Sequence, residues 1–176
     1  ARMRMRPMSL LESQDSSGSV SLKDMFAGKQ PIAQAQSGTI DDLAFLVCRG
    51  GWPKAIGQKQ DVSLQQAIDY VDALTSVDIS RVDGVDRNEA SAHALLRSYA
   101  RFSSSQGTLE SIRKDMDSFA TLGESAFSGY IEALRRLFVI DDLEAWSPNL
   151  RSRTAIRTSP TRHFVDPSIA AAALGA

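Results

Sequence analysis

The sequence is almost without cysteine: Cys48 is the single one among 176 residues. One thiol excludes an intrachain disulfide framework and an all-cysteine metal site. A reducing, cytoplasmic setting fits this composition. Cys48 lies inside an apolar run at residues 43–48, and we expect it to pack as a small hydrophobic side chain.

Long apolar runs are also missing, because no stretch approaches the roughly 18 residues that a membrane-spanning helix needs. The basic residues Arg2, Arg4 and Arg6 are not followed by the continuous apolar segment of a secretory signal. We therefore expect a soluble protein without a membrane partner.

Net charge is nearly absent at −1, so attraction of the whole molecule to nucleic acid is not indicated. Any such binding must come from a local basic patch. The 43% hydrophobic and 23% charged residues are typical of a globular chain of one or two domains.

Catalytic and metal-binding patterns are lacking as well. His93 and His163 are far apart, and neither stands beside a serine or cysteine in a recognisable nucleophilic arrangement. The aspartates at residues 41–42, 78–86 and 141–142 have no accompanying histidine or regular ligand spacing, so caps and turns explain them better. We predict no catalytic residue, no metal site and no cofactor within this chain.

What the sequence does contain is helical periodicity. A short helix is expected at residues 21–26, and Thr39 is a predicted N-cap for a helix over 40–49, whose apolar residues favour deep burial. A second amphipathic helix is predicted over 63–75, followed by an aspartate-rich connector at 78–86. Asp86 and Glu89 resemble a capping box for the next helix.

The second half predicts helices over 87–104, 109–119 and 125–138, with Thr108 as a cap and a turn at Gly123. Apolar segments at 139–146 and 162–165 indicate two short strands around a loop at 147–161, and Asp166 with Pro167 begins a closing helix. The fold class is therefore mainly α: a helical subdomain at 38–85, then a winged helix-turn-helix domain at 86–165 with a small β-hairpin wing.

The loop at 147–161 has the strongest local charge bias, since it holds arginines and no acidic residue. Several arginines acting together along a phosphate backbone would support nucleic-acid binding. Against this, Glu124 and Glu132 lie on the predicted third helix and would repel phosphate, so contact with a protein partner is at least as well supported. The candidate nucleic-acid residues are Arg151, Arg153, Arg157, Arg162, Arg135 and Ser128.

Gly50-Gly51-Trp52-Pro53 is a candidate partner surface, because paired glycines permit close backbone approach and tryptophan often anchors interfaces. The alternative is a helix stop followed by a packed aromatic side chain, which we favour.

Several segments together resemble a family of bacterial and archaeal AAA-type ATPases. The most specific are the arginine-glycine-glycine-tryptophan-proline stretch and the phenylalanine-valine-aspartate-proline stretch. The matching segments are Arg6–Glu12, Cys48–Pro53, Leu95–Ala100, Ser128–Leu134 and Phe164–Pro167.

The resemblance implies a P-loop ATPase module, which binds ATP and Mg²⁺, followed by a helical segment, a winged helix and a restriction-endonuclease-like fold. A G-x-x-x-x-G-K-[ST] phosphate-binding loop is absent from these 176 residues. We therefore expect a fragment: residues 1–12 as the last strand and exit of a missing ATPase core, 13–37 as a linker, and 166–176 as a closing helix cut before a further domain.

These features predict a non-catalytic segment that couples ATP-driven motion of its own missing core to a bound partner, the parent being an ATPase. One alternative is a DNA-binding module acting on duplex DNA through the basic loop. The other is a structural scaffold between two catalytic domains.

Overall fold

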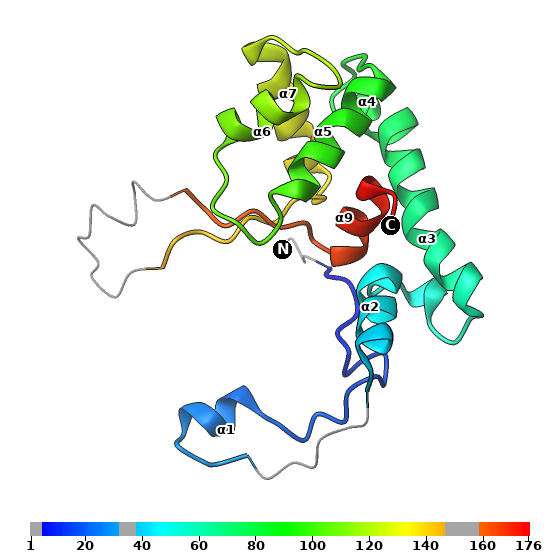
Figure 1. The fold of residues 1–176 in the computed structure, drawn as a ribbon, viewed down its shortest axis with the longest axis vertical. Helices are drawn as coiled ribbons and strands as arrows, with labels where there is room; N and C mark the ends of the chain where they lie inside the picture. The colour runs from blue at the N-terminus through cyan, green and yellow to red at the C-terminus, as the bar shows by residue number, and fades with distance from the viewer. Residues whose placement is uncertain (1–4, 32–37, 147–158) are drawn as a thin grey trace.

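The structure is a computed structural model that describes residues 5–31, 38–146 and 159–176, and it is mainly helical (Figure 1). Within these ranges the chain forms no sheet, and its only β contacts are isolated bridges. The helices are α1 Leu22–Phe26, α2 Ile40–Arg49, α3 Gln60–Ala73, α4 Ile79–Arg81, α5 Glu89–Arg101, α6 Leu109–Met116, α7 Glu124–Arg136 and α9 Pro167–Leu174.

The predicted N-caps of α2, α6 and α9 are confirmed, and α1 is capped by Ser21, the first residue of the short helix expected at 21–26. Thr39 forms a reciprocal capping box with Asp42, and Ser21, Thr108 and Asp166 each accept a backbone N–H of the helix that follows. The start predicted for α5 is wrong by two residues. Asn88, and not Asp86, is its N-cap, because the Asn88 side chain accepts the N–H of Ser91 at 2.9 Å.

The connector predicted at 78–86 is partly helical instead. From α3 the chain continues through a π-helical turn at Leu74–Asp78 into α4. Leu74 and Ile79 are both fully buried. Their five-residue spacing departs from the three- and four-residue steps of an α-helix, and a π turn brings both to the same face.

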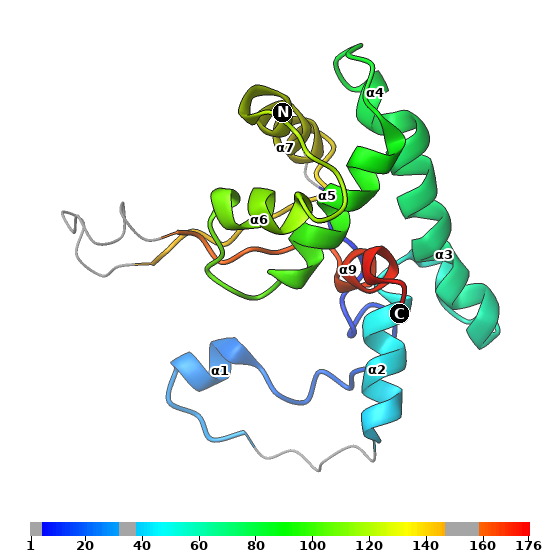
Figure 2. The same ribbon diagram turned by 45° about the horizontal axis from the view of Figure 1, so that its top comes forward.

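The core is continuous from Val71 to Ile169 and includes residues on both sides of position 86. Helix α9 lies between α2, α3 and α5 in both views (Figures 1 and 2) and contacts all three. The C-terminal helix therefore joins the part of the chain before residue 86 to the part after it.

Helix α7 buries the apolar face that its periodicity predicts, with Phe127, Ile131 and Leu134 inside. The same spacing would place Phe138 inward at the end of the helix predicted over 125–138, but more than half of it is exposed. The reason is local: α7 ends at Arg136, and Phe138 adopts a left-handed conformation with φ 57°. This turn places Val139, rather than Phe138, in the core.

The two segments predicted as strands do run antiparallel, through bridges between Ile140 and Phe164 and between Leu143 and Thr161. Leu143 and Thr161 exchange two backbone hydrogen bonds of 2.9 Å. The pairing is thus present as isolated bridges and not as strands. Residues 147–158 of the predicted wing lie outside the described part of the chain, so the wing remains a prediction.

The N-terminal part differs most from expectation. Residues 5–9 form no strand; the Met8 N–H donates to the Gly51 carbonyl at 2.9 Å, and Ser9 and Glu12 close the turn that follows. The deep burial expected for α2 is wrong as well, since only Arg49 of this helix is buried. Even Cys48 is only half-buried.

Candidate functional site

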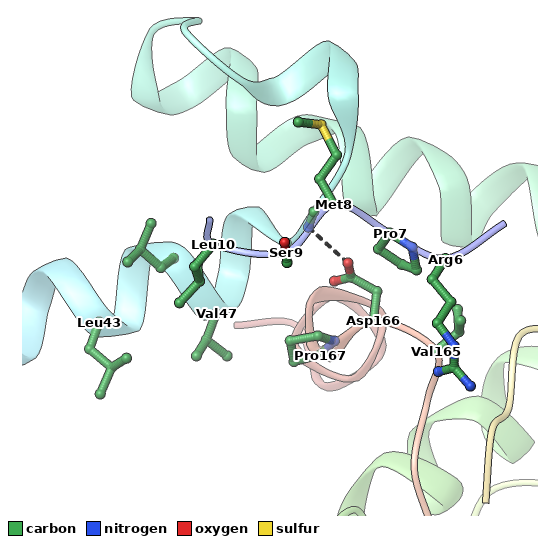
Figure 3. A pocket seen from close by; sticks show the side chains of 13 residues that line it. Arg6, Pro7, Met8, Ser9, Leu10, Leu43, Val47, Val165, Asp166 and Pro167 are labelled. Carbon is green, nitrogen blue, oxygen red and sulfur yellow. Dashed lines mark hydrogen bonds between the residues drawn. The ribbon is translucent and has the colours of Figure 1, made fainter. Parts of the chain in front are cut away.

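The end of α2 and the start of α9 meet at one buried carboxylate. Oδ2 of Asp166 accepts the Gly51 N–H at 2.8 Å (Figure 3), while Oδ1 accepts the N–H and the hydroxyl of Ser168 at 2.9 and 2.6 Å. Asp166 is 2% exposed. One side chain thus caps α9 and holds the turn after α2. We call Met8, residues 49–52, Asp166 and Ser168 the junction.

Trp52 connects the junction to α3 and α9 through its side chain. Its indole Nε1 donates to the Ser168 hydroxyl at 2.8 Å, and its ring lies 4.7 Å from that of Tyr70, between centroids. Burial, with a smaller contribution from Asp78, raises the pKa of Tyr70. The Gly50-Gly51-Trp52-Pro53 segment is therefore a helix stop followed by a packed aromatic side chain. Of its four residues, only Pro53 is exposed.

Both positions of the junction require glycine, because neighbouring atoms lie where a Cβ would be. Gly50 has φ 68°, and a Cβ at this position would lie 2.9 Å from Cγ of Asp166. A Cβ on Gly51 would lie 2.7 Å from the backbone nitrogen of Met8. Real Cβ atoms do not come this close, so the paired glycines serve internal packing.

Arg49 ties the junction to the N-terminal segment. Its guanidinium donates to Asp15 at 2.7 Å and to the Gly50 carbonyl at 3.2 Å, and its side chain is 7% exposed. The hydrogen bond from Arg49 holds the pKa of Asp15 below its usual range. Asp15 was missed by sequence reasoning, because nothing in the sequence pairs two residues that are 34 positions apart.

Two hollows adjoin the junction, and Arg6 and Pro7 line both of them. The first, about 320 Å³, lies against the outer face of α2 and is lined largely by apolar side chains such as Leu10, Leu43 and Val47 (Figure 3). The second, about 470 Å³, is lined by Trp52 and Tyr70, by Leu137 and Phe138 just after α7, and by residues of the N-terminal segment.

Arg162, predicted to contact nucleic acid, lies in the interior instead. It is 4% exposed, and its guanidinium forms an ion pair with Asp142 and donates to the Gly107 carbonyl at 2.7 Å. Asp142 also accepts the hydroxyl of Tyr99. Burial, assisted by this carboxylate, raises the pKa of Tyr99. With every contact internal, Arg162 is not placed to meet a phosphate.

Of the other predicted nucleic-acid residues, the structure describes only Arg135 and Ser128. Arg135 and Ser128 are exposed on α7, where the neighbouring Arg136 pairs with Glu132 at 3.2 Å. Arg151, Arg153 and Arg157 lie outside the described residues. Their expected contribution remains a prediction.

Comparison with known proteins identifies a family for most of the chain. The profile described as a domain of unknown function, DUF8612, matches residues 40–176. The chain belongs to this family. No curated protein and no solved structure matches it. The DUF8612 match begins at the first residue of α2 and includes all junction residues except Met8. It provides no link to AAA-type ATPases or to a restriction-endonuclease-like fold.

Within the described ranges, the DUF8612 chain contains no group of three or more histidine, cysteine, aspartate or glutamate residues placed to hold a metal ion. Nor does any helix there have the length and apolar character needed to cross a membrane.

Proposed function

We propose that this chain is a non-catalytic segment of a larger AAA-type ATP-binding protein and transmits nucleotide-driven movement to a bound partner. The proposal rests on the sequence resemblance together with one structural observation. The segments that carry the resemblance most specifically, around Gly51 and around Asp166, meet at the junction, where residues 6–8 also arrive.

This arrangement has a mechanical consequence. A pull on the chain before Met8 acts on the Gly51 backbone through their shared hydrogen bond. From Gly51 it passes through Asp166 to α9, which contacts α2, α3 and α5. A displacement of the entering segment would therefore reach the core through Gly51 and the buried Asp166.

Nucleotide binding tests where the ATP site lies. We expect no heat of binding when Mg-ATP is titrated into the 176-residue chain. A chain extended upstream should contain a G-x-x-x-x-G-K-[ST] loop and hydrolyse ATP. Hydrolysis by the short chain, or an upstream coding sequence without such a loop, would contradict the proposal.

Hydrogen exchange in the extended chain separates coupling from a passive scaffold. Coupling predicts that the Gly51 and Ser168 amides, both bound to Asp166, change their exchange rates between the ATP and ADP states. A scaffold predicts no change at these amides.

DNA binding is the main rival function and has its own test. Because Arg162 is buried and Arg136 is paired with Glu132, we expect no detectable affinity for duplex DNA at low salt. The control is the variant with both Arg151 and Arg153 changed to alanine. A salt-dependent affinity that this variant loses would favour DNA binding over coupling.

A further inference from the structure

The N-terminal part of the chain has no apolar core of its own. In its described residues before position 50, no large apolar side chain is buried, whereas the later part has a continuous core. Isolated exposed apolar side chains are ordinary, but a concentration of them marks an interaction surface. Besides Met5 at 86%, which lines the second hollow, the exposed ones are Leu10 45%, Leu11 58%, Val20 51%, Leu22 72%, Met25 48%, Phe26 91%, Ile40 77%, Leu43 53% and Val47 40%.

One half of this surface is an arm that carries α1. Leu22, Met25 and Phe26 follow three- and four-residue spacing and so share one face of the helix, and no residue of α1 is buried. A helix of five residues has little stability by itself in water. Both views show α1 standing apart from the helices of the core (Figures 1 and 2). The arm therefore needs a surface to dock on.

The other half is the outer face of α2. Ile40, Leu43 and Val47 form one exposed stripe on this helix, and Leu43 and Val47 line the 320 Å³ hollow together with Leu10 from the N-terminal segment. We call this stripe and the hollow beside it the α2 groove. The groove has the apolar character and helical spacing that suit an amphipathic helix.

We propose that the α1 arm of one copy docks in the α2 groove of a second copy, and that the exchange is reciprocal. The chain thus supplies both an unburied amphipathic helix and an apolar groove. A two-fold exchange covers both arms and both grooves at once, which is the usual geometry of a swapped dimer.

Charge and area support a second copy as the occupant. Lys23 flanks the apolar face of α1, and Asp41 flanks the stripe of α2; neither has an ion-pair partner among the described residues. The exposed surface of the residues named on the arm (Leu22, Met25, Phe26) and on the groove (Leu10, Ile40, Leu43, Val47) amounts to on the order of 900 Å² per copy. A stable interface buries about 800 Å² per partner.

Self-association of the 176-residue chain tests this inference. Sedimentation equilibrium at micromolar concentrations should give twice the chain mass of 19.1 kDa. Phe26→Asp and Val47→Asp should each weaken the dimer at least about 30-fold, as expected for removal of an interface anchor. Val62→Asp, at an exposed apolar position of α3 outside this surface, should leave the dimer unchanged.

A monomeric wild-type chain at about 100 µM, or a dimer that tolerates both substitutions, would overturn the proposal. The variants should remain folded, because neither Phe26 nor Val47 is buried. Far-UV circular dichroism checks this. Neither outcome bears on the proposed coupling function.

Cross-linking separates exchange between copies from closure within one copy. In a Lys23→Cys variant, a short bismaleimide should join the introduced thiol on α1 of one copy to the native Cys48 of the other and give a covalent dimer. The same variant with Cys48→Ser should not cross-link in this way. An intramolecular cross-link within a monomer would overturn the second copy as the occupant.

Discussion

Gly50→Ala is expected to destabilise the chain by about 2–6 kcal/mol, because two costs add at this position. With φ 68° and ψ −170°, alanine would occupy a backbone region that is almost exclusive to glycine, at a cost of about 1–3 kcal/mol. Its Cβ would also collide with the Asp166 carboxylate and the Ser168 hydroxyl, and overpacking in a filled interior costs about 1–3 kcal/mol more. The free energy of unfolding from urea titration measures the sum.

Gly84→Ala is the matched control. Gly84 has a similar φ of 74°, but no heavy atom lies within 4 Å of the added Cβ. It therefore carries the conformational cost alone, about 1–2 kcal/mol. Equal losses in the two variants would show that close approach to Asp166 contributes nothing at Gly50.

Arg162→Ala is expected to destabilise the chain by about 3–5 kcal/mol, the usual result of removing one partner of a buried ion pair. The substitution leaves the Asp142 carboxylate without its buried guanidinium partner and the Gly107 carbonyl without its donor. Thermal or urea unfolding gives the change in stability.

Arg135→Ala provides the comparison on the same carboxylate. Arg135 lies 4.0 Å from Asp142, but its side chain is 47% exposed, so its loss should cost at most about 1 kcal/mol. If Arg162 served only to contact a phosphate, both variants would retain wild-type stability.

Contacts between segments that are distant in sequence thus contribute strongly to the stability of the fold. The junction joins residues 115 positions apart through Gly51 and Asp166, and the Arg162 cluster joins residues 55 positions apart through the Gly107 carbonyl. A substitution at either point changes a contact between two elements, and it does not change the tendency of either segment to form a helix.

Local features of this protein were determined by the sequence alone. Thr39, Thr108 and Asp166 specify helix starts, and Gly50 specifies the end of α2, because a cap satisfies backbone groups within a few residues of itself. The buried face of α7 follows from the three- and four-residue spacing of its apolar residues, which is also a local feature.

Only the tertiary structure decided which faces are covered and which charges are internal. The apolar sequence of α2 favoured burial, yet Leu43 and Val47 on its outer face are exposed. In sequence, Arg162 resembled the other arginines at 151–157, but the structure encloses it by Asp142, Tyr99 and Gly107. Burial depends on segments that lie far apart in sequence, and a pattern read along one helix or loop contains no information about them.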